Sequence, residues 1–174
     1  MLSRPVSCYR YFFALPVPPE VCADIAEMLE GRFPLSRRVT GDRLHVPLAI
    51  LDDLKGRRPD VAEALADIGR RFKPQPVRLA FDRLAVAKDQ VLLVSTEPMP
   101  VLLTVQAQLQ LAMQKAGFAR RKQWRFSPQI SLATRQGRGH CNWIEPVSWQ
   151  ASELLLIQNQ LGAARHHVLA RWRF

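Results

Sequence analysis

The sequence predicts an α+β fold, and three observations support this class. Helical and β-type spacings of apolar residues follow one another in a mixed order: strand, helix, strand, helix, two strands, helix, strand, two strands. Short turns near Lys88-Asp89 and around Gly162 join neighbouring strands, which makes those pairs antiparallel. The length of 174 residues fits one domain that spans residues 1–174.

Three segments have the apolar spacing of amphipathic helices. The first, "PPEVCADIAEMLEGRF", begins at prolines and ends at Gly31. The second is "RPDVAEALADIGRRF", and the third is "PVLLTVQAQLQLAMQKAG", which ends at Gly117. The positions expected to face the core are Val21, Ile25, Met28 and Leu29, then Val61, Leu65, Ile68 and Phe72, then Leu102, Val105, Leu109 and Met113.

Seven segments are predicted to be strands. The opening one, "CYRYFFAL", is rich in aromatic residues, and we expect Phe13 to lie in the core. The loop most suited to mobility is "RQGRGHCN", which has glycines and no apolar periodicity. The other predicted strands are "DRLHVPLAIL", "PVRLAFDRLAV", "QVLLVST", "SPQISLAT", "SELLLIQNQ" and "RHHVLARWRF".

The charge is strongly positive and unevenly distributed. The formal net charge is +10 at pH 7, and no Asp or Glu occurs between Glu97 and Glu145. That stretch interleaves basic residues with aromatic ones, a pattern that suits a polyanion with bases that can stack. Solvated surface arginines are the alternative explanation. The residues concerned are Lys115, Arg120, Arg121, Lys122, Arg125, Arg135 and Arg138, with Phe118, Trp124 and Phe126 among them.

The sequence predicts a cytoplasmic protein that does not enter a membrane. No apolar run approaches the ~20 residues of a membrane span. The N-terminal segment is interrupted by Arg10 and several prolines, so we interpret it as a first strand and not as a signal peptide. Cys8, Cys22 and Cys141 match neither a disulfide framework nor a zinc motif.

Two of the predicted strands contain similar five-residue stretches. The first is "HVPLA", from His45, and the second is "QISLA", from Gln129. Because successive side chains in a strand point to opposite faces, His45 and Pro47 share one face, as do Gln129 and Ser131. The alternate positions are apolar and suit the core. Two such strands facing one another would line a groove.

These motifs resemble the 2H phosphoesterases, specifically the bacterial RNA 2′,3′-cyclic phosphodiesterases, which are also called 2′-5′ RNA ligases. "RYFFALPVPPEV" is similar to the opening of that family, and "DRLHVPLAIL" and "RFSPQISLATR" are similar to its two His-x-Thr-x strands. "NW…SELLLIQNQLGAARHHVLARWRF" is similar to its closing strand pair. The resemblance covers nearly the whole chain.

The resemblance implies a bilobal fold with two antiparallel sheets, helices outside them and a central groove. One motif from each lobe would line the groove. One motif histidine would activate water to attack a cyclic phosphate, and the other would protonate the leaving ribose oxygen. The motif hydroxyls would hold the phosphoryl oxygens. The resemblance implies no metal and no cofactor.

The sequence departs from the family motif at two positions. Gln129 stands where the second histidine is expected, and Pro47 where the first threonine is expected. Gln129 can donate its amide hydrogens to phosphate, but it cannot transfer a proton. Pro47 has neither a hydroxyl nor a backbone N–H, so we expect a bulge or an edge position there. Ser131 keeps a hydroxyl in the second motif.

These residues give the candidate site. We expect His45 to be catalytic, and Gln129, Ser131, Arg125 and Arg135 to bind the substrate. For Arg125 and Arg135, which flank the second motif, a solvated surface role is the alternative. Trp124 or Phe126 could stack a terminal base, although core packing suits Phe126 better. His140, His166 and His167 could each replace the missing acid, but structural or solvent-facing roles fit all three better.

Three functions remain open. The first is hydrolysis of RNA 2′,3′-cyclic phosphate ends to 2′-phosphates, with activity reduced by Gln129. The second is non-catalytic binding of RNA ends or nucleotides in the basic groove. The third is an enzyme that acts on another small cyclic or phosphorylated nucleotide. The expected partner is RNA with a 2′,3′-cyclic phosphate end or a related nucleotide, and the expected oligomeric state is a monomer.

Overall fold

The computed structural model confirms the predicted α+β class. It describes residues 7–34, 37–87, 89–134, 141–163 and 165–174. The strands are β1 Cys8–Pro16, β2 His45–Ile50, β3 Leu54–Lys55, β4 Val77–Ala87, β5 Gln90–Val94, β6 Gln129–Thr134, β7 Cys141–Ala151, β8 Glu153–Gln160 and β9 Arg165–Arg173. The helices are α1 Pro19–Leu29, α2 Pro59–Arg71 and α3 Pro100–Lys115, and a short 3-10 turn spans Gly41–Arg43.

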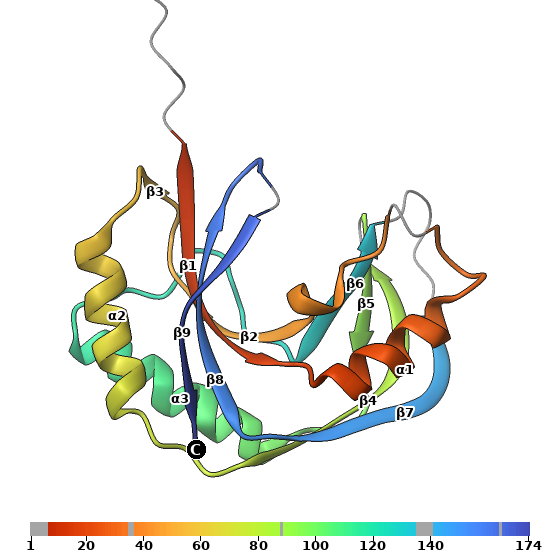
Figure 1. The fold of residues 1–174 in the computed structure, drawn as a ribbon. Coiled ribbons are helices and arrows are strands. Elements are labelled where there is room, and N and C mark those ends of the chain that lie inside the picture. The colour runs from red at the N-terminus through yellow and green to blue at the C-terminus, as the bar shows by residue number, and fades with distance from the viewer. Residues whose placement is uncertain (1–6, 35–36, 88, 135–140, 164) are drawn as a thin grey trace, which may run out of the picture.

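The strands form two antiparallel sheets (Figure 1). One has the order β2-β1-β8-β9, with β3 also pairing with β1. The other has the order β6-β5-β4-β7. The predicted hairpin near Asp89 is confirmed, because Ala87 pairs with Gln90 in the β4–β5 ladder. The predicted closing pair is confirmed as β8 and β9.

The three helices pack against the two sheets. Helix α1 follows β1 but contacts β7 of the other sheet. Helix α3 follows β5 and contacts both β4 and β2 (Figure 1). Helix α2 contacts β8 and β9. The residues expected to be buried in α3, namely Leu102, Val105, Leu109 and Met113, are all buried. None of the helices in the described residues has the length and apolar content that a bilayer crossing requires.

Strand β1 lies inside the first sheet and presents different residues on its two faces. Tyr11, Phe13 and Leu15 are fully buried in the main hydrophobic core. Arg10 and Phe12 alternate with them and lie on the opposite face, where both line a cavity. The aromatic run "YRYFF" therefore serves the core and the cavity at once, because strand side chains alternate between faces.

The structure shows both of the features expected at Pro47, an edge position and a bulge. Strand β2 is an edge strand of its sheet. The β1–β2 register also shifts between Phe13 and Ala14, which pair with Ala49 and Pro47. An edge strand with a bulge accommodates a residue that has no backbone N–H, because no ladder hydrogen bond is required there.

Strand β7 is the main element that the sequence did not predict. Within the described part of the chain it pairs with β4 alone, at the edge of the second sheet. Most of its residues are exposed, and Pro146 lies in its middle. An edge strand needs no continuous apolar pattern and tolerates proline, so the usual signals are weak. Residues 135–140 of the predicted mobile loop lie outside the described residues, and the rest of that segment, Cys141 and Asn142, begins β7.

Gly69 of α2 allows a close approach that no other residue would permit. A Cβ added to Gly69 would lie 2.4 Å from two ring atoms of Trp172, on β9. The Trp172 ring in turn lies beside that of Phe13, with centroids 6.3 Å apart. Gly69→Ala should therefore lower the free energy of unfolding by about 1–3 kcal/mol through overpacking, although alanine is the better helix former. Denaturant unfolding measures this change.

The matched control for Gly69→Ala is Glu63→Ala, at an exposed position of the same helix. It changes helix propensity without adding volume in the core, so we expect a shift within about 0.5 kcal/mol. A Gly69→Ala protein as stable as the wild type would show that Trp172 moves aside at no cost.

Candidate active site

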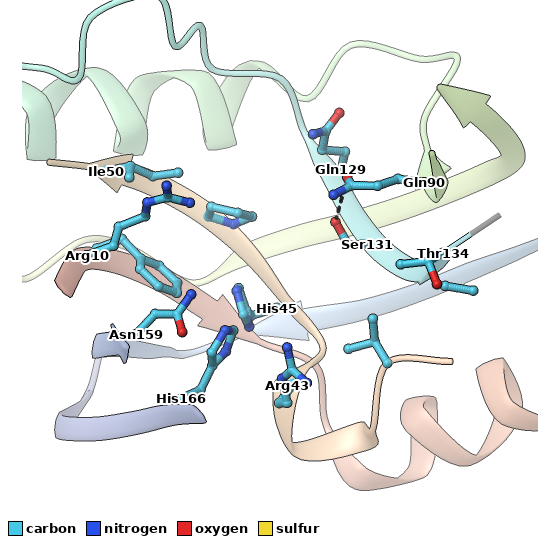
Figure 2. Close-up of a pocket in the computed structure, with 14 residues that line it drawn as sticks. Arg10, Arg43, His45, Ile50, Gln90, Gln129, Ser131, Thr134, Asn159 and His166 are labelled. Atoms are coloured by element: carbon cyan, nitrogen blue, oxygen red, sulfur yellow. Dashed lines mark hydrogen bonds between the residues drawn. The ribbon is translucent and has the colours of Figure 1, made fainter. Parts of the chain in front are cut away.

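A cavity of about 320 Å³ lies between the two sheets, with both repeated motifs in its walls (Figure 2). Strands β1, β2, β8 and β9 contribute Arg10, Phe12, His45, Pro47, Ile50, Asn159 and His166. Strands β5 and β6 contribute Gln90, Gln129, Ser131, Ala133 and Thr134. Val39 and Arg43, which precede β2, complete the lining. Residues of the first motif thus face residues of the second across this cavity.

One wall of the cavity carries two histidines side by side. The ring centroids of His45, on β2, and His166, on β9, are 5.5 Å apart. The buried ring of Phe12 lies against both, 5.2 Å from His45 and 5.9 Å from His166 in an edge-to-face arrangement. The Phe12 ring therefore packs against both imidazoles and restricts their orientation.

Both histidines favour the neutral state. Burial, followed by the neighbouring His166 and Arg43, lowers the pKa of His45 to about 4, and a hydrogen bond to the backbone of Arg43 acts in the opposite direction. Burial, followed by the charge of Arg43, also lowers the pKa of His166, while Asp42 opposes that change. At neutral pH each ring therefore keeps one nitrogen as a proton acceptor.

Polar atoms without partners surround the histidine pair. Among the described residues, Arg43 Nε, Asn159 Oδ1 and His166 Nδ1 are buried and have no hydrogen-bond partner in the structure. All three residues line the cavity (Figure 2). Buried polar groups are normally paired, so such a cluster in one cavity is typical of a site that a polar ligand completes.

The opposite wall carries the second motif. Ser131 is exposed to the cavity, and its Oγ donates to Gln90 Oε1 at 3.5 Å (Figure 2). Gln129 lies two residues before Ser131 on β6 and faces the same cavity. An amide and a hydroxyl can each donate a hydrogen bond to an anion. This wall can bind phosphate, but among the described residues that form it there is no group that could act as a general base.

An ion-pair network holds one border of the cavity. Arg10 Nε and Nη2 donate to the two carboxylate oxygens of Asp53 at 2.7 and 3.0 Å. Arg121 Nη1 and Nη2 donate to the same carboxylate at 2.7 and 3.3 Å. These guanidinium groups hold the pKa of Asp53 well below its usual range. Arg121, one of the basic residues of the acid-free stretch, is thus engaged in a structural contact.

Asp53→Asn should lower the free energy of unfolding at pH 7 by about 1 kcal/mol, since the network is bidentate but partly exposed. The folded-state pKa is depressed, so the contribution is present above the ordinary Asp pKa and disappears as the pH falls through the folded value. Chemical unfolding at pH 7 and at pH 3, with and without added salt, measures it. Asp52→Asn is the control, because its side-chain oxygen can still accept from the Lys122 N–H. A salt-independent loss would contradict an electrostatic origin.

The structure brings together three of the five site residues predicted from the sequence. His45, Gln129 and Ser131 line one cavity. Arg125 is exposed in the segment before β6 and is not part of the lining. Arg135 lies outside the described residues, as does His140. Trp124 and Phe126 lie together, with ring centroids 6.2 Å apart, and Phe126 packs on the core.

His166 lines the cavity, although the sequence analysis did not include it among the expected site residues. The sequence favoured a structural or solvent-facing role, but the structure places the ring beside His45. Its neighbour His167 is exposed. The strand alternation of His166 and His167 was visible in the sequence, but the register that aligns β9 with β8 and β1 was not. Among the described residues, no cluster of three His, Cys, Asp or Glu side chains could hold a metal ion.

Comparison with known proteins identifies the fold. No family model and no curated protein sequence matches the chain. Solved structures do match. E. coli LigT in complex with 3′-AMP has a TM-score of 0.74 at 23% identity, over 97% of this chain and 98% of that chain. E. coli LigT in complex with phosphate has a TM-score of 0.70 at 25% identity, over 96% and 98%.

A structure described as a phosphoesterase matches with a TM-score of 0.73 at 23% identity, over 95% of this chain and 97% of that chain. The chain has the LigT-like fold of the 2H phosphoesterases. The fold implied by the sequence resemblance is therefore confirmed over nearly the whole chain.

Proposed function

We propose that this protein is a 2H phosphoesterase that hydrolyses 2′,3′-cyclic phosphate ends of RNA to 2′-phosphates, with His45 as general base. The observation that carries the proposal is the neutral, half-buried His45 in a cavity with cationic and hydrogen-bonding groups around it. Opening a cyclic phosphodiester requires a base for water and stabilisation of the phosphoryl oxygens, and these groups supply both.

The cavity suits a nucleotide phosphate. Its volume of about 320 Å³ lies at the lower end of the range for small-molecule sites. Arg43 and Arg10 contribute positive charge on one side, and Gln129 and Ser131 contribute donors on the other. The relative with the same fold, LigT, has been solved with 3′-AMP and with phosphate. A terminal phosphate between the two walls could accept from the unpartnered Nε of Arg43.

The tautomer of His45 is compatible with the role of base. The backbone of Arg43 favours a proton on the His45 ring, and a neutral imidazole carries that proton on one nitrogen only. The other nitrogen of a neutral imidazole is then a proton acceptor. A water held between His45 and the bound phosphate would be deprotonated as it attacks phosphorus.

The second candidate function is binding without turnover, and Gln129 is the observation that favours it. An amide on the second-motif strand keeps the ability to bind phosphate and loses the ability to transfer a proton. A third candidate, turnover of another small cyclic nucleotide, would use the same His45. The two enzymatic candidates predict turnover that disappears with His45→Ala, whereas the binder predicts salt-dependent binding without turnover.

The test uses a short RNA that ends in a 2′,3′-cyclic phosphate, with free 2′,3′-cyclic nucleotides in parallel. Formation of the phosphomonoester is followed for the wild type, Gln129→His and Ser131→Ala. We expect wild-type turnover, with Ser131→Ala slower by about 10-fold through loss of one phosphate donor. An inert wild type that binds the RNA, together with activity in Gln129→His, would establish the binder. If the wild type and Gln129→His neither bind nor cleave any of these probes, the proposed substrate class is wrong.

A further inference from the structure

We propose that His166 is the second proton-transfer residue of this site and replaces the imidazole that Gln129 lacks. The inference rests on the proposed function and assigns the leaving-group acid to β9 of the first sheet, on the same wall as His45. The chain would thus keep a two-histidine mechanism with both histidines in a new arrangement.

The register of the first sheet places His166 on the cavity face. In the strand ladders Arg10 pairs with Asn159, and Asn159 pairs with His166. Directly paired residues of neighbouring strands share a face. These three side chains therefore form a row across β1, β8 and β9, and all three line the cavity (Figure 2). His167, one residue further, is exposed.

The distance between the two rings suits catalysis at one phosphorus. In an in-line displacement the entering and leaving oxygens lie on opposite sides of phosphorus. Each imidazole must come within about 3 Å of its own oxygen. Ring centroids 5.5 Å apart allow one ring to reach the entering oxygen and the other the leaving oxygen. The burial of His166 Nδ1 leaves Nε2 as the nitrogen for this contact.

The surroundings of the two rings assign the roles. Asp42 favours the protonated form of His166, while no carboxylate stabilises protonated His45. His166 is therefore the ring that is protonated more readily before the reaction, and His45 is the ring that begins neutral, as a general base must. A bound phosphate adds negative charge next to both rings and favours the protonated state of the pair.

The proposed reaction is balanced with water as the only co-reactant. A water oxygen forms a bond to phosphorus while His45 takes its proton. The bond between phosphorus and the ribose 3′ oxygen breaks, and protonated His166 gives its proton to that oxygen. The products are a 3′ hydroxyl and a 2′-phosphate. His45 is left protonated and His166 neutral, and transfer of the proton between the adjacent rings, directly or through a water, restores the starting state.

The test compares two substrates that differ in their need for an acid. One is an RNA with a 2′,3′-cyclic phosphate end, whose leaving alkoxide must be protonated. The other is a 2′-deoxynucleoside 3′-(4-nitrophenyl phosphate), whose phenolate leaves without a proton. His166→Gln should lose ~10²–10⁴-fold in kcat on the cyclic phosphate and less than about 10-fold on the nitrophenyl ester. His45→Gln should lose activity on both substrates. His167→Gln changes the neighbouring exposed histidine and should keep its activity on both.

A second readout separates catalysis from a structural role. Added imidazole should restore part of the cyclic-phosphate activity of His166→Ala, because the truncated side chain leaves room in the cavity for a free base. If His166→Gln keeps wild-type turnover, or loses activity equally on both substrates, the inference is overturned and the proposed function stands. A wild type that is inert on both substrates overturns the proposed function and this inference together.

Discussion

His45→Ala should reduce turnover of an RNA 2′,3′-cyclic phosphate by ~10²–10⁴-fold, the usual contribution of a positioned general base. The effect should appear in kcat, with KM changed only a few-fold. Arg43, Gln129 and Ser131 remain in the cavity and can still bind the phosphate. Water without a base to accept its proton is a poor nucleophile at neutral pH. Steady-state kinetics with a 5′-labelled RNA measures both constants.

The control for His45→Ala must show that the cavity survives. The imidazole rests on Phe12, and its removal leaves a space beside that ring. Binding of inorganic phosphate, followed by calorimetry, should therefore remain within a few-fold of the wild type in His45→Ala. Wild-type turnover in His45→Ala would exclude this residue as the base. Loss of phosphate binding together with activity would assign it to binding instead.

Most of the fold could be predicted from the sequence because its signals are local. The helices bury the predicted faces, with Leu65, Ile68, Leu102 and Met113 among the buried residues. Strand alternation explains why Gln129 and Ser131 both face the cavity, whereas Ile130 and Leu132 point to the opposite side and are fully buried. The bulge and edge position at Pro47 also follow from the chemistry of a single residue.

Two features could not be predicted from the sequence: the edge strand β7 and the place of His166 in the cavity. Strand β7 was not predicted because an edge strand does not require apolar alternation. The cavity role of His166 depends on the Asn159–His166 and Arg10–Asn159 pairs, which join strands from both ends of the chain. A sequence shows which residues alternate along one strand, but not which strand lies beside it. For that reason His45 was assigned to the site from its motif, whereas His166 was one of three possible replacement histidines until the structure placed it beside His45.

The pH profile of kcat/KM should lie at lower pH than expected for histidines with an ordinary pKa. Because the pKa of His45 is lowered to about 4, the free protein should keep its base deprotonated well below the ordinary histidine range. We expect the rising limb of kcat/KM near pH 4 and not near pH 6.5. If His166 is the acid, its lowered pKa places the falling limb below 6.5, so kcat/KM should be highest in mildly acidic buffer. A rising limb near 6.5 would contradict the burial of His45.

Arg43→Gln tests the cause of that displacement. The charge of Arg43 lowers the pKa of His45, after burial and the neighbouring His166. Its removal should move the rising limb upward, toward but not as far as 6.5, because burial remains. Arg32→Gln, at an exposed position, is the control and should leave the limb in place. The midpoint of the rising limb is read from the pH profile of kcat/KM after normalisation to its maximum. A weaker affinity for phosphate in Arg43→Gln therefore does not affect the comparison.

The same depressed pKa makes a thermodynamic prediction that needs no substrate. Between pH 6.5 and pH 4 the unfolded chain binds a proton that folded His45 does not, so the free energy of unfolding falls as the pH falls, by up to about 1.4 kcal/mol per pH unit. This contribution is present above pH 6.5 and should be missing in His45→Ala. Denaturant unfolding at several pH values would then show a shallower slope for the variant. Equal slopes would mean that His45 titrates in the folded protein as it does in the unfolded chain, and the neutral base at the centre of the proposed mechanism would lose its physical basis.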